Sequence, residues 1–190
     1  HLKVFCDIYK PGMSNLTSIK TLQDLYNELW EQKLARLNDK SIYNDVLNAL
    51  KLIVESMDTA KGITAPSALL DGNNIGANYL KSQSIIHVQG RNQIQFFHSS
   101  FFDYCYARNF VKRQESLIGS ILEQEQGLFV RPKIKQVMAY LRETDKNRYL
   151  KELKEFLTNE SLRFHVKLLV INHLAFLEDP EDAEWQIIRR

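Results

Sequence analysis

Apolar residues follow a helical period along most of the chain, and one segment interrupts that period. Over residues 17–37, 41–62 and 73–83 the apolar side chains recur every three or four positions, as on one face of a helix. Between residues 85 and 97 the period becomes two, on either side of a turn that contains Gly90. Two short alternating segments around such a turn predict a β-hairpin. We therefore expect a mainly α fold with one small two-stranded hairpin.

Capping and breaking residues mark where these helices begin and end. A short apolar helix over residues 2–9 stops at Pro11, and a longer helix follows it. Ser41 is the expected N-cap of the next helix, and Gly62 lies near the end of that helix. Pro66 is expected to begin a turn or a short helix before the last helix ahead of the hairpin. Three helices followed by a hairpin is the order of a winged helix.

Residues 126–190 are predicted to form paired helices. Short polar connectors separate their apolar segments, which favours antiparallel neighbours. One pair follows the other at a spacing of about 30 residues, which is typical of the opening units of an α-solenoid, although such arrays normally need three units for stability. The predicted helices span residues 132–143, 147–157, 162–177 and 181–190.

The composition is that of an ordinary globular chain with 190 residues, of which 44% are hydrophobic. Lysine and arginine number 25 against 23 acidic residues, which leaves a net charge of +2. So small a charge creates no field that attracts nucleic acid or an anionic membrane, and no apolar run approaches the roughly 18 residues of a spanning helix. We therefore expect neither nucleic acid nor a membrane as a partner. His1 is not a natural start, so an upstream targeting segment stays open.

The two cysteines, Cys6 and Cys105, are far apart in the sequence and lie on apolar faces of their predicted helices. They form no C-x-x-C pair, which would have indicated a redox or metal motif. Buried free thiols in a reducing compartment are the better interpretation. We therefore expect a cytoplasmic protein.

The most informative position is His98, where the alternating segment stops and an aromatic helix begins. Ser99 and Ser100 are suitable N-caps for that helix, and Asp103 can complete a capping box with Ser100. A histidine at a helix N-terminus lies beside unpaired backbone N–H groups and the positive end of the helix dipole. This combination predicts an anion site, and phosphate is the expected ligand. A purely structural histidine, hydrogen-bonded inside the junction, is the alternative.

Residues 96–104, F-F-H-S-S-F-F-D-Y, together with Ala107, resemble the F-x-H-x-[ST]-F-x-[DE]-Y-x-x-A motif that closes the winged-helix domain of NACHT-type STAND ATPases. A second segment, from H-L-K-V-F-C-D-I-Y at residues 1–9 to Trp30, is similar to the helical segment that follows the nucleotide-binding core in that family. Both segments occur in the family's order, and the resemblance covers roughly residues 1–125. The nucleotide-binding core itself is missing from this sequence.

The resemblance implies a division into three parts: a helical-domain segment over residues 1–40, a winged helix over 41–125 and a helical-repeat segment over 126–190. It implies that His98 reaches the β-phosphate of ADP, so that the chain stabilises the ADP-bound closed state and relays ligand sensing to oligomerisation. The implied cofactor of the parent protein is ADP or ATP with Mg²⁺. The implied partners are the upstream nucleotide-binding domain, further copies of the parent and a protein ligand of the repeats. The implied roles are defence against phage or other intracellular signalling.

The chain is not expected to be an enzyme by itself. It has only seven glycines and no G-x-x-x-x-G-K-[ST] motif, so it has no loop of its own to hold a nucleoside triphosphate. His165 and His173 have no further ligand at metal-binding spacing, so a zinc site is not expected.

Two other functions stay open. One is a DNA-binding winged helix that reads bases with Asn73, Asn74 and Asn78. The other is a helical-repeat scaffold that binds a protein.

Overall fold

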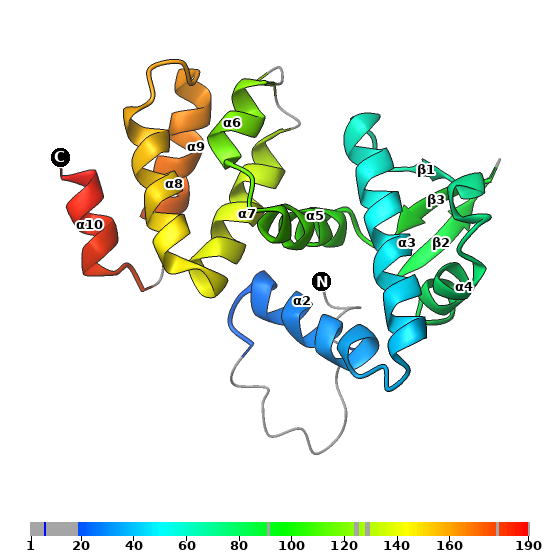
Figure 1. The fold of residues 1–190 in the computed structure, drawn as a ribbon. Helices are drawn as coiled ribbons and strands as arrows, with labels where there is room; N and C mark the ends of the chain where they lie inside the picture. The colour runs from blue at the N-terminus through cyan, green and yellow to red at the C-terminus, as the bar shows by residue number, and fades with distance from the viewer. Residues whose placement is uncertain are drawn as a thin grey trace. The chain divides into compact units, whose positions relative to one another are not determined.

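The computed structural model of this chain is mainly helical and contains one small antiparallel sheet (Figure 1), as the hydrophobic pattern predicts. The chain forms two compact units, His1–Cys105 and Tyr106–Arg190, and the boundary lies inside helix α5 (Ser99–Arg113). The division into three parts at residues 40 and 125 stays a prediction. The structure describes Cys6 and residues 19–90, 92–123, 126–127, 130–177 and 179–189.

The first unit begins with α2 (Leu22–Trp30), which continues through one π-helical segment, η2 (Glu31–Ala35). The prediction that this helix starts at about residue 17 was wrong, because Thr21 is its N-cap. The Thr21 hydroxyl accepts from the backbone N–H of Asp24, whose carboxylate accepts from the N–H of Thr21. The helix predicted over residues 2–9 lies outside the described residues, apart from Cys6.

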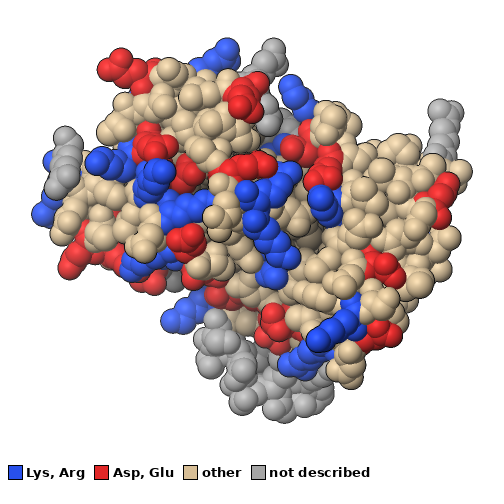
Figure 2. Space-filling model, viewed as in Figure 1, with Lys and Arg blue, Asp and Glu red and all other residues tan. Residues whose placement is uncertain are grey.

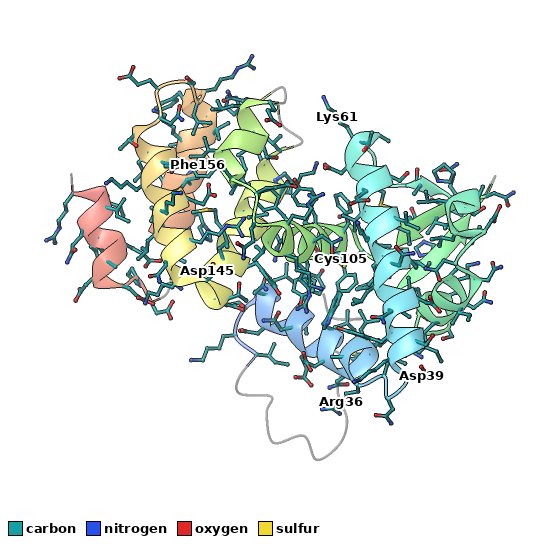
Figure 3. The ribbon with its side chains drawn as sticks, in the orientation of Figure 1. Arg36, Asp39, Lys61, Cys105, Asp145 and Phe156 are labelled. Carbon is teal, nitrogen blue, oxygen red and sulfur yellow. The ribbon has the colours of Figure 1, made fainter. Side chains whose placement is uncertain are left out.

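Helix α3 (Lys40–Thr59) is the longest helix of the described chain, and residues other than the predicted Ser41 determine its ends. Asp39 is the N-cap, and its carboxylate accepts from the N–H groups of Ser41 at 2.8 Å and of Ile42 at 3.3 Å. At the other end Lys61 takes a left-handed backbone with φ of 50°, next to the predicted Gly62. Figure 3 marks Asp39 and Lys61 at the two ends of this helix.

The predicted hairpin at residues 85–97 is confirmed as β2 (Ile86–Gln89) and β3 (Gln93–Phe96). A third strand, β1 (Ala65–Pro66), pairs with β3, so the sheet has the antiparallel order β1-β3-β2. The short helix expected after Pro66 is the 3₁₀ helix η3 (Ser67–Leu70). Helix α4 (Asn74–Ser82) leads into β2. A two-residue strand is too short for a periodic pattern, so only its pairing with β3 defines it.

The second unit consists of helices joined by short connectors, and the four helices predicted after residue 126 are confirmed to within a few residues. The helices of this unit after α5 are α6 (Leu117–Leu122), α7 (Val130–Thr144), α8 (Lys146–Thr158), α9 (Phe164–Ala175) and α10 (Asp182–Ile188). The six-residue helix α6 was not predicted. It lies close to α8, where the buried carboxylate of Glu152 accepts from the backbone N–H groups of Leu117 at 3.0 Å and Ile118 at 3.4 Å. Within the described ranges, no helix combines the length and the apolar character needed to cross a bilayer.

A buried ion pair attaches the short helix α10 to the rest of the second unit. The Arg142 guanidinium donates to both carboxylate oxygens of Glu184, at 2.7 and 3.3 Å, and to Asp179. Glu184 is only 2% exposed, so its charge depends on this arginine for solvation. The arginine therefore determines where α10 lies against its neighbours.

We expect Arg142→Ala to lower the free energy of unfolding of the second unit by about 3–5 kcal/mol, because Glu184 would stay buried without a counter-charge. Denaturation in urea, followed by the fluorescence of Trp185 on α10, measures this change. The double variant Arg142→Ala with Glu184→Gln removes the uncompensated charge and should recover part of the loss. Equal stability of the single and double variants would contradict the role given to the ion pair.

Candidate anion site at the hairpin-to-helix junction

His98 occupies the position immediately before the first residue of α5, where the hairpin ends. The backbone N–H of Phe97 donates to Ile85 O at 3.0 Å, which extends the pairing of β2 and β3 to the edge of the junction. One residue later the chain has turned into a helix, and the N–H of Phe101 donates to His98 O at 3.1 Å. Hairpin and helix together therefore hold the backbone of His98 on both sides.

The side chain of His98 is itself the cap of α5. Its Nδ1 atom accepts from the backbone N–H of Ser100 at 3.2 Å and lies 2.6 Å from Ser100 Oγ. The prediction that Ser99 or Ser100 caps this helix was wrong, because both residues already lie inside its first turn. The predicted capping box between Ser100 and Asp103 fails for the same reason.

Ser100 links the His98 ring to Tyr26. The backbone N–H of Ser100 donates to Nδ1, and Ser100 Oγ lies within hydrogen-bond distance both of Nδ1 and of the Tyr26 hydroxyl, whose oxygen is 2.5 Å away. The result is a series of hydrogen-bonding groups from Tyr26 through Ser100 to His98.

The aromatic run around His98 packs as a core. Phe101 and Tyr104 are fully buried, and their ring centroids lie 5.2 and 5.6 Å from that of Tyr26. The Tyr104 hydroxyl donates to Asn27 Oδ1 at 2.9 Å, so α2 and α5 share polar as well as aromatic contacts. This packing makes the start of α5 a rigid support for His98.

A pocket of about 380 Å³ adjoins His98, in the size range of small-molecule sites. It contains a second histidine, His87, whose strand position is directly opposite Gln95, and the side chains of this pair are in contact. Neither His87 nor Gln95 was predicted as a site residue, although strand alternation places both on the outer face of the hairpin. The residues that line the pocket are Ile63, His87, Gln95, Phe96, Phe97, His98, Ser99 and Phe102.

The polar groups of this pocket suit an anion better than a cation. Two imidazoles, one carboxamide and one hydroxyl line it together with apolar groups, and no lining residue is acidic. The positive end of the α5 dipole adds to the same preference. Among the described residues, no three His, Cys, Asp or Glu side chains are grouped closely enough to hold a metal ion.

Other residues singled out from the sequence lie elsewhere. Cys105 is a buried free thiol as expected, whereas Cys6 is free but exposed, so the expectation that both are buried was wrong.

Asn73 caps α4 and donates to Asp45 O at 2.6 Å, and Asn74 donates to Asp71 O at 3.3 Å. Two of the three asparagines proposed to read DNA bases are therefore engaged within the chain. Figure 2 shows few charged side chains on the visible face over β2 and β3.

Comparison with known protein families, with curated proteins and with solved structures finds no match for this chain. Its function is therefore inferred from its own residues and from the motif that they form.

Asp103 lies one turn after His98 and gives the junction a measurable pH dependence. Burial raises its pKa from 3.8 to about 6. The folded protein therefore binds this proton more tightly than the unfolded chain, and the contribution of Asp103 to stability falls as the pH rises from about 4 to 6.

We expect Asp103→Asn to stabilise the protein at pH 7–8 by up to about 3 kcal/mol, since each pKa unit corresponds to about 1.4 kcal/mol. At about pH 4 the two proteins should be equally stable, because the native aspartate is then protonated in the fold. Thermal midpoints of both proteins, measured across this pH range, test the expectation. Parallel curves at every pH would show that Asp103 is not the group that titrates.

Proposed function

We propose that this chain is the regulatory part of a NACHT-type STAND ATPase, which stabilises the ADP-bound closed state and relays ligand sensing to oligomerisation. The observation that carries the proposal is the position of His98. Its ring caps the N-terminus of α5 and lines a pocket that has no acidic lining residue, where a phosphate is well stabilised. The family's motif assigns the β-phosphate of ADP to this same histidine.

The order of elements in the first unit supports a winged helix at this position. Three helical segments, α3, η3 and α4, precede the hairpin of β2 and β3, and α5 follows directly after it. The third strand, β1, joins the hairpin to the end of α3 and so makes one module of these elements. The successive helices α7, α8, α9 and α10 support an α-solenoid-like array after it.

The hydrogen bonds from Tyr26 to His98 suggest how a nucleotide state is relayed. Tyr26 belongs to α2, in the segment expected to follow the nucleotide-binding core, and Ser100 joins its hydroxyl to the His98 ring. A phosphate bound by His98 would fix the position of its ring, and the ring is joined to Tyr26 through Ser100. A change at the nucleotide is thus transmitted to α2 through two hydrogen bonds.

The parent protein would supply the nucleotide and the partners of this chain. The nucleotide, ADP or ATP with Mg²⁺, belongs to an upstream domain, so this chain is a regulator and not the catalyst. Its partners are that domain and further copies of the parent on activation. Two free thiols and no disulfide among the described residues support a reducing compartment such as the cytoplasm. A DNA-binding winged helix has less support, because Asn73 and Asn74 serve internal contacts.

The chain by itself is expected to bind ADP with a Kd of about 1 mM or weaker and to leave ATP intact, because a few hydrogen bonds to phosphate supply no more than about 4 kcal/mol. Calorimetric titration with ADP and with Mg-ATP, together with a phosphate-release assay, measures both properties. Sub-micromolar binding would mean that the nucleotide site lies in this chain and that the division of roles is wrong.

In the parent protein, His98→Ala should release ADP at least ten-fold faster, because a hydrogen bond to a charged group contributes about 1.5–3 kcal/mol. The sharper variant is His98→Asn. Asparagine is a good N-cap, but it is shorter than histidine and has no second ring nitrogen that could reach the phosphate. It should keep the thermal midpoint and still release ADP faster.

Phe101→Ala provides the folding control for this experiment. Phe101 is fully buried, so its loss should cost about 3–5 kcal/mol of stability. If His98→Asn leaves the ADP off-rate at the native value while His98→Ala only destabilises the domain, His98 is a structural cap and the regulatory proposal loses its central residue.

A further inference from the structure

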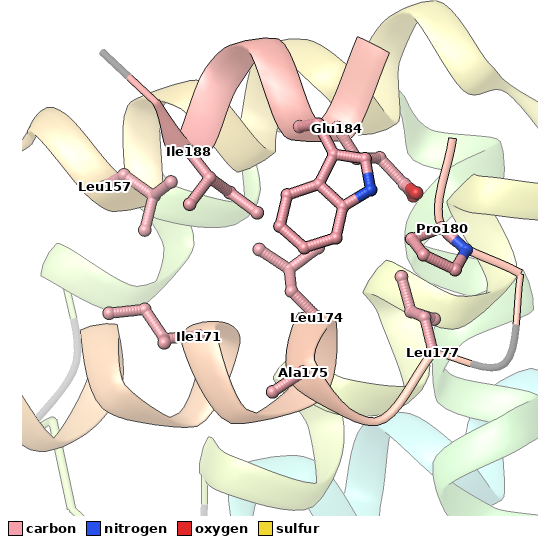
Figure 4. Close-up of a pocket in the computed structure, with 9 residues that line it drawn as sticks. Leu157, Ile171, Leu174, Ala175, Leu177, Pro180, Glu184 and Ile188 are labelled. Atoms are coloured by element: carbon pink, nitrogen blue, oxygen red, sulfur yellow. The ribbon is translucent and has the colours of Figure 1, made fainter. Parts of the chain in front are cut away.

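Helix α9 ends beside an ion pair that belongs to two neighbouring helices. Its last turn contains His173 and Leu174, and Leu174 lines an apolar groove of about 290 Å³ together with Glu184 of α10 (Figure 4). The same glutamate binds Arg142 of α7 at 2.7 Å. The end of α9 therefore lies where α7 and α10 are tied together.

The side chain of His173 has a buried ring nitrogen. Its Nε2 atom is closed to solvent and has no hydrogen-bond partner among the described residues. A neutral imidazole carries one N–H group, whereas an imidazolium carries two and a positive charge. Burial of a charged group without partners is costly. The fold therefore favours the neutral form of His173.

The charged groups around His173 add to this preference. Burial has the largest effect and lowers the pKa of His173. Lys135 and Arg142 of α7 lower it further, whereas Glu184 of α10 raises it. Helix α8 contributes Tyr149 to the same cluster, and burial beside Glu184 raises the pKa of its hydroxyl, so this group stays neutral. A protonated His173 would be a third cation beside one buried carboxylate, which Arg142 already binds.

These effects make the second unit sensitive to acid. A histidine in an unfolded chain has a pKa of about 6.5, and His173 in the fold has a lower one. An opened state that hydrates the ring therefore binds more protons than the closed state. The contribution of His173 to stability is complete above about pH 7 and is lost as the pH falls from about 6.5 toward the pKa of the folded state.

Helix α10 is the element that opening at this place would release. It has seven residues, too few for a stable helix by itself, and the ion pair of Glu184 with Arg142 ties it to α7. Once α10 leaves, water reaches the last turn of α9. A histidine cation is favoured there, because it lies at the negative end of the helix dipole. A proton on His173 is thus stabilised in the open state and penalised in the closed one.

We propose that His173 is a pH switch, in which proton uptake by its buried ring in mild acid releases α10 from α7 and uncovers the end of α9. Release of α10 also removes one wall of the apolar groove, so the surface of the second unit changes with pH. The switch lies within the second unit and is independent of nucleotide binding at His98.

Hydrogen–deuterium exchange of the whole chain, followed by mass spectrometry, tests this proposal. A peptide that covers α10 reports the opening of that helix, once its rate is corrected for the intrinsic pH dependence of exchange. We expect the opening equilibrium constant of α10 to rise by up to about ten-fold per pH unit from about pH 6.5 to 5, because one proton is bound on opening. A peptide that covers α4 in the first unit should not show this rise.

Variants of the two α9 histidines assign the effect to one ring. His173→Gln cannot take up a proton and should abolish the rise, whatever it does to stability at pH 7.5. His173→Leu is a second neutral replacement, for the case that the glutamine variant folds poorly. His165→Gln is the matched control, because His165 lies on the same helix and its Nε2 is likewise buried, and it should keep the rise.

Several results would overturn the proposal. They are an opening constant of α10 that stays level from pH 6.5 to 5, a rise that persists in both neutral variants of His173, and loss of the rise in His165→Gln. An equal rise in peptides from every helix of the second unit would show that acid unfolds the whole unit and that α10 is not released separately.

Discussion

The first unit depends on how the N-terminus of α5 is satisfied. The first turn of any helix leaves backbone N–H groups without partners, and here the His98 ring supplies an acceptor for one of them. A serine or aspartate would cap the helix equally well, but an imidazole has a second nitrogen on its far side. Its Nδ1 is engaged at the helix N-terminus, and the same ring lines the pocket beside it. The helix cap and the candidate anion site therefore share one side chain.

The second unit depends on buried carboxylates in the same way. Its two shortest helices, α6 and α10, are too short to be stable alone, because helix nucleation is unfavourable and needs many residues to offset it. Glu152 of α8 accepts from the first N–H groups of α6, and Glu184 of α10 is held by Arg142 of α7. Each short helix thus exists because a buried charge ties it to a longer one.

The two units offer contrasting surfaces. The pocket at His98 is lined by several hydrogen-bonding groups, whereas the groove beside α9 is almost wholly apolar. The physical basis of recognition differs accordingly, since the first depends on a few directed hydrogen bonds and the second on buried area.

The sequence by itself determined the helices and the hairpin, because their periods of 3.6 and 2 depend only on neighbouring residues. It was less reliable for helix ends, since Asp39 and Ser41 are both good caps and the local pattern does not choose between them. Tertiary structure alone decided the two-residue strand β1, which exists only through pairing with β3. It also decided the environment of His98, because Tyr26 and Ser100 are separated by 74 positions. No local pattern encodes which distant side chains meet.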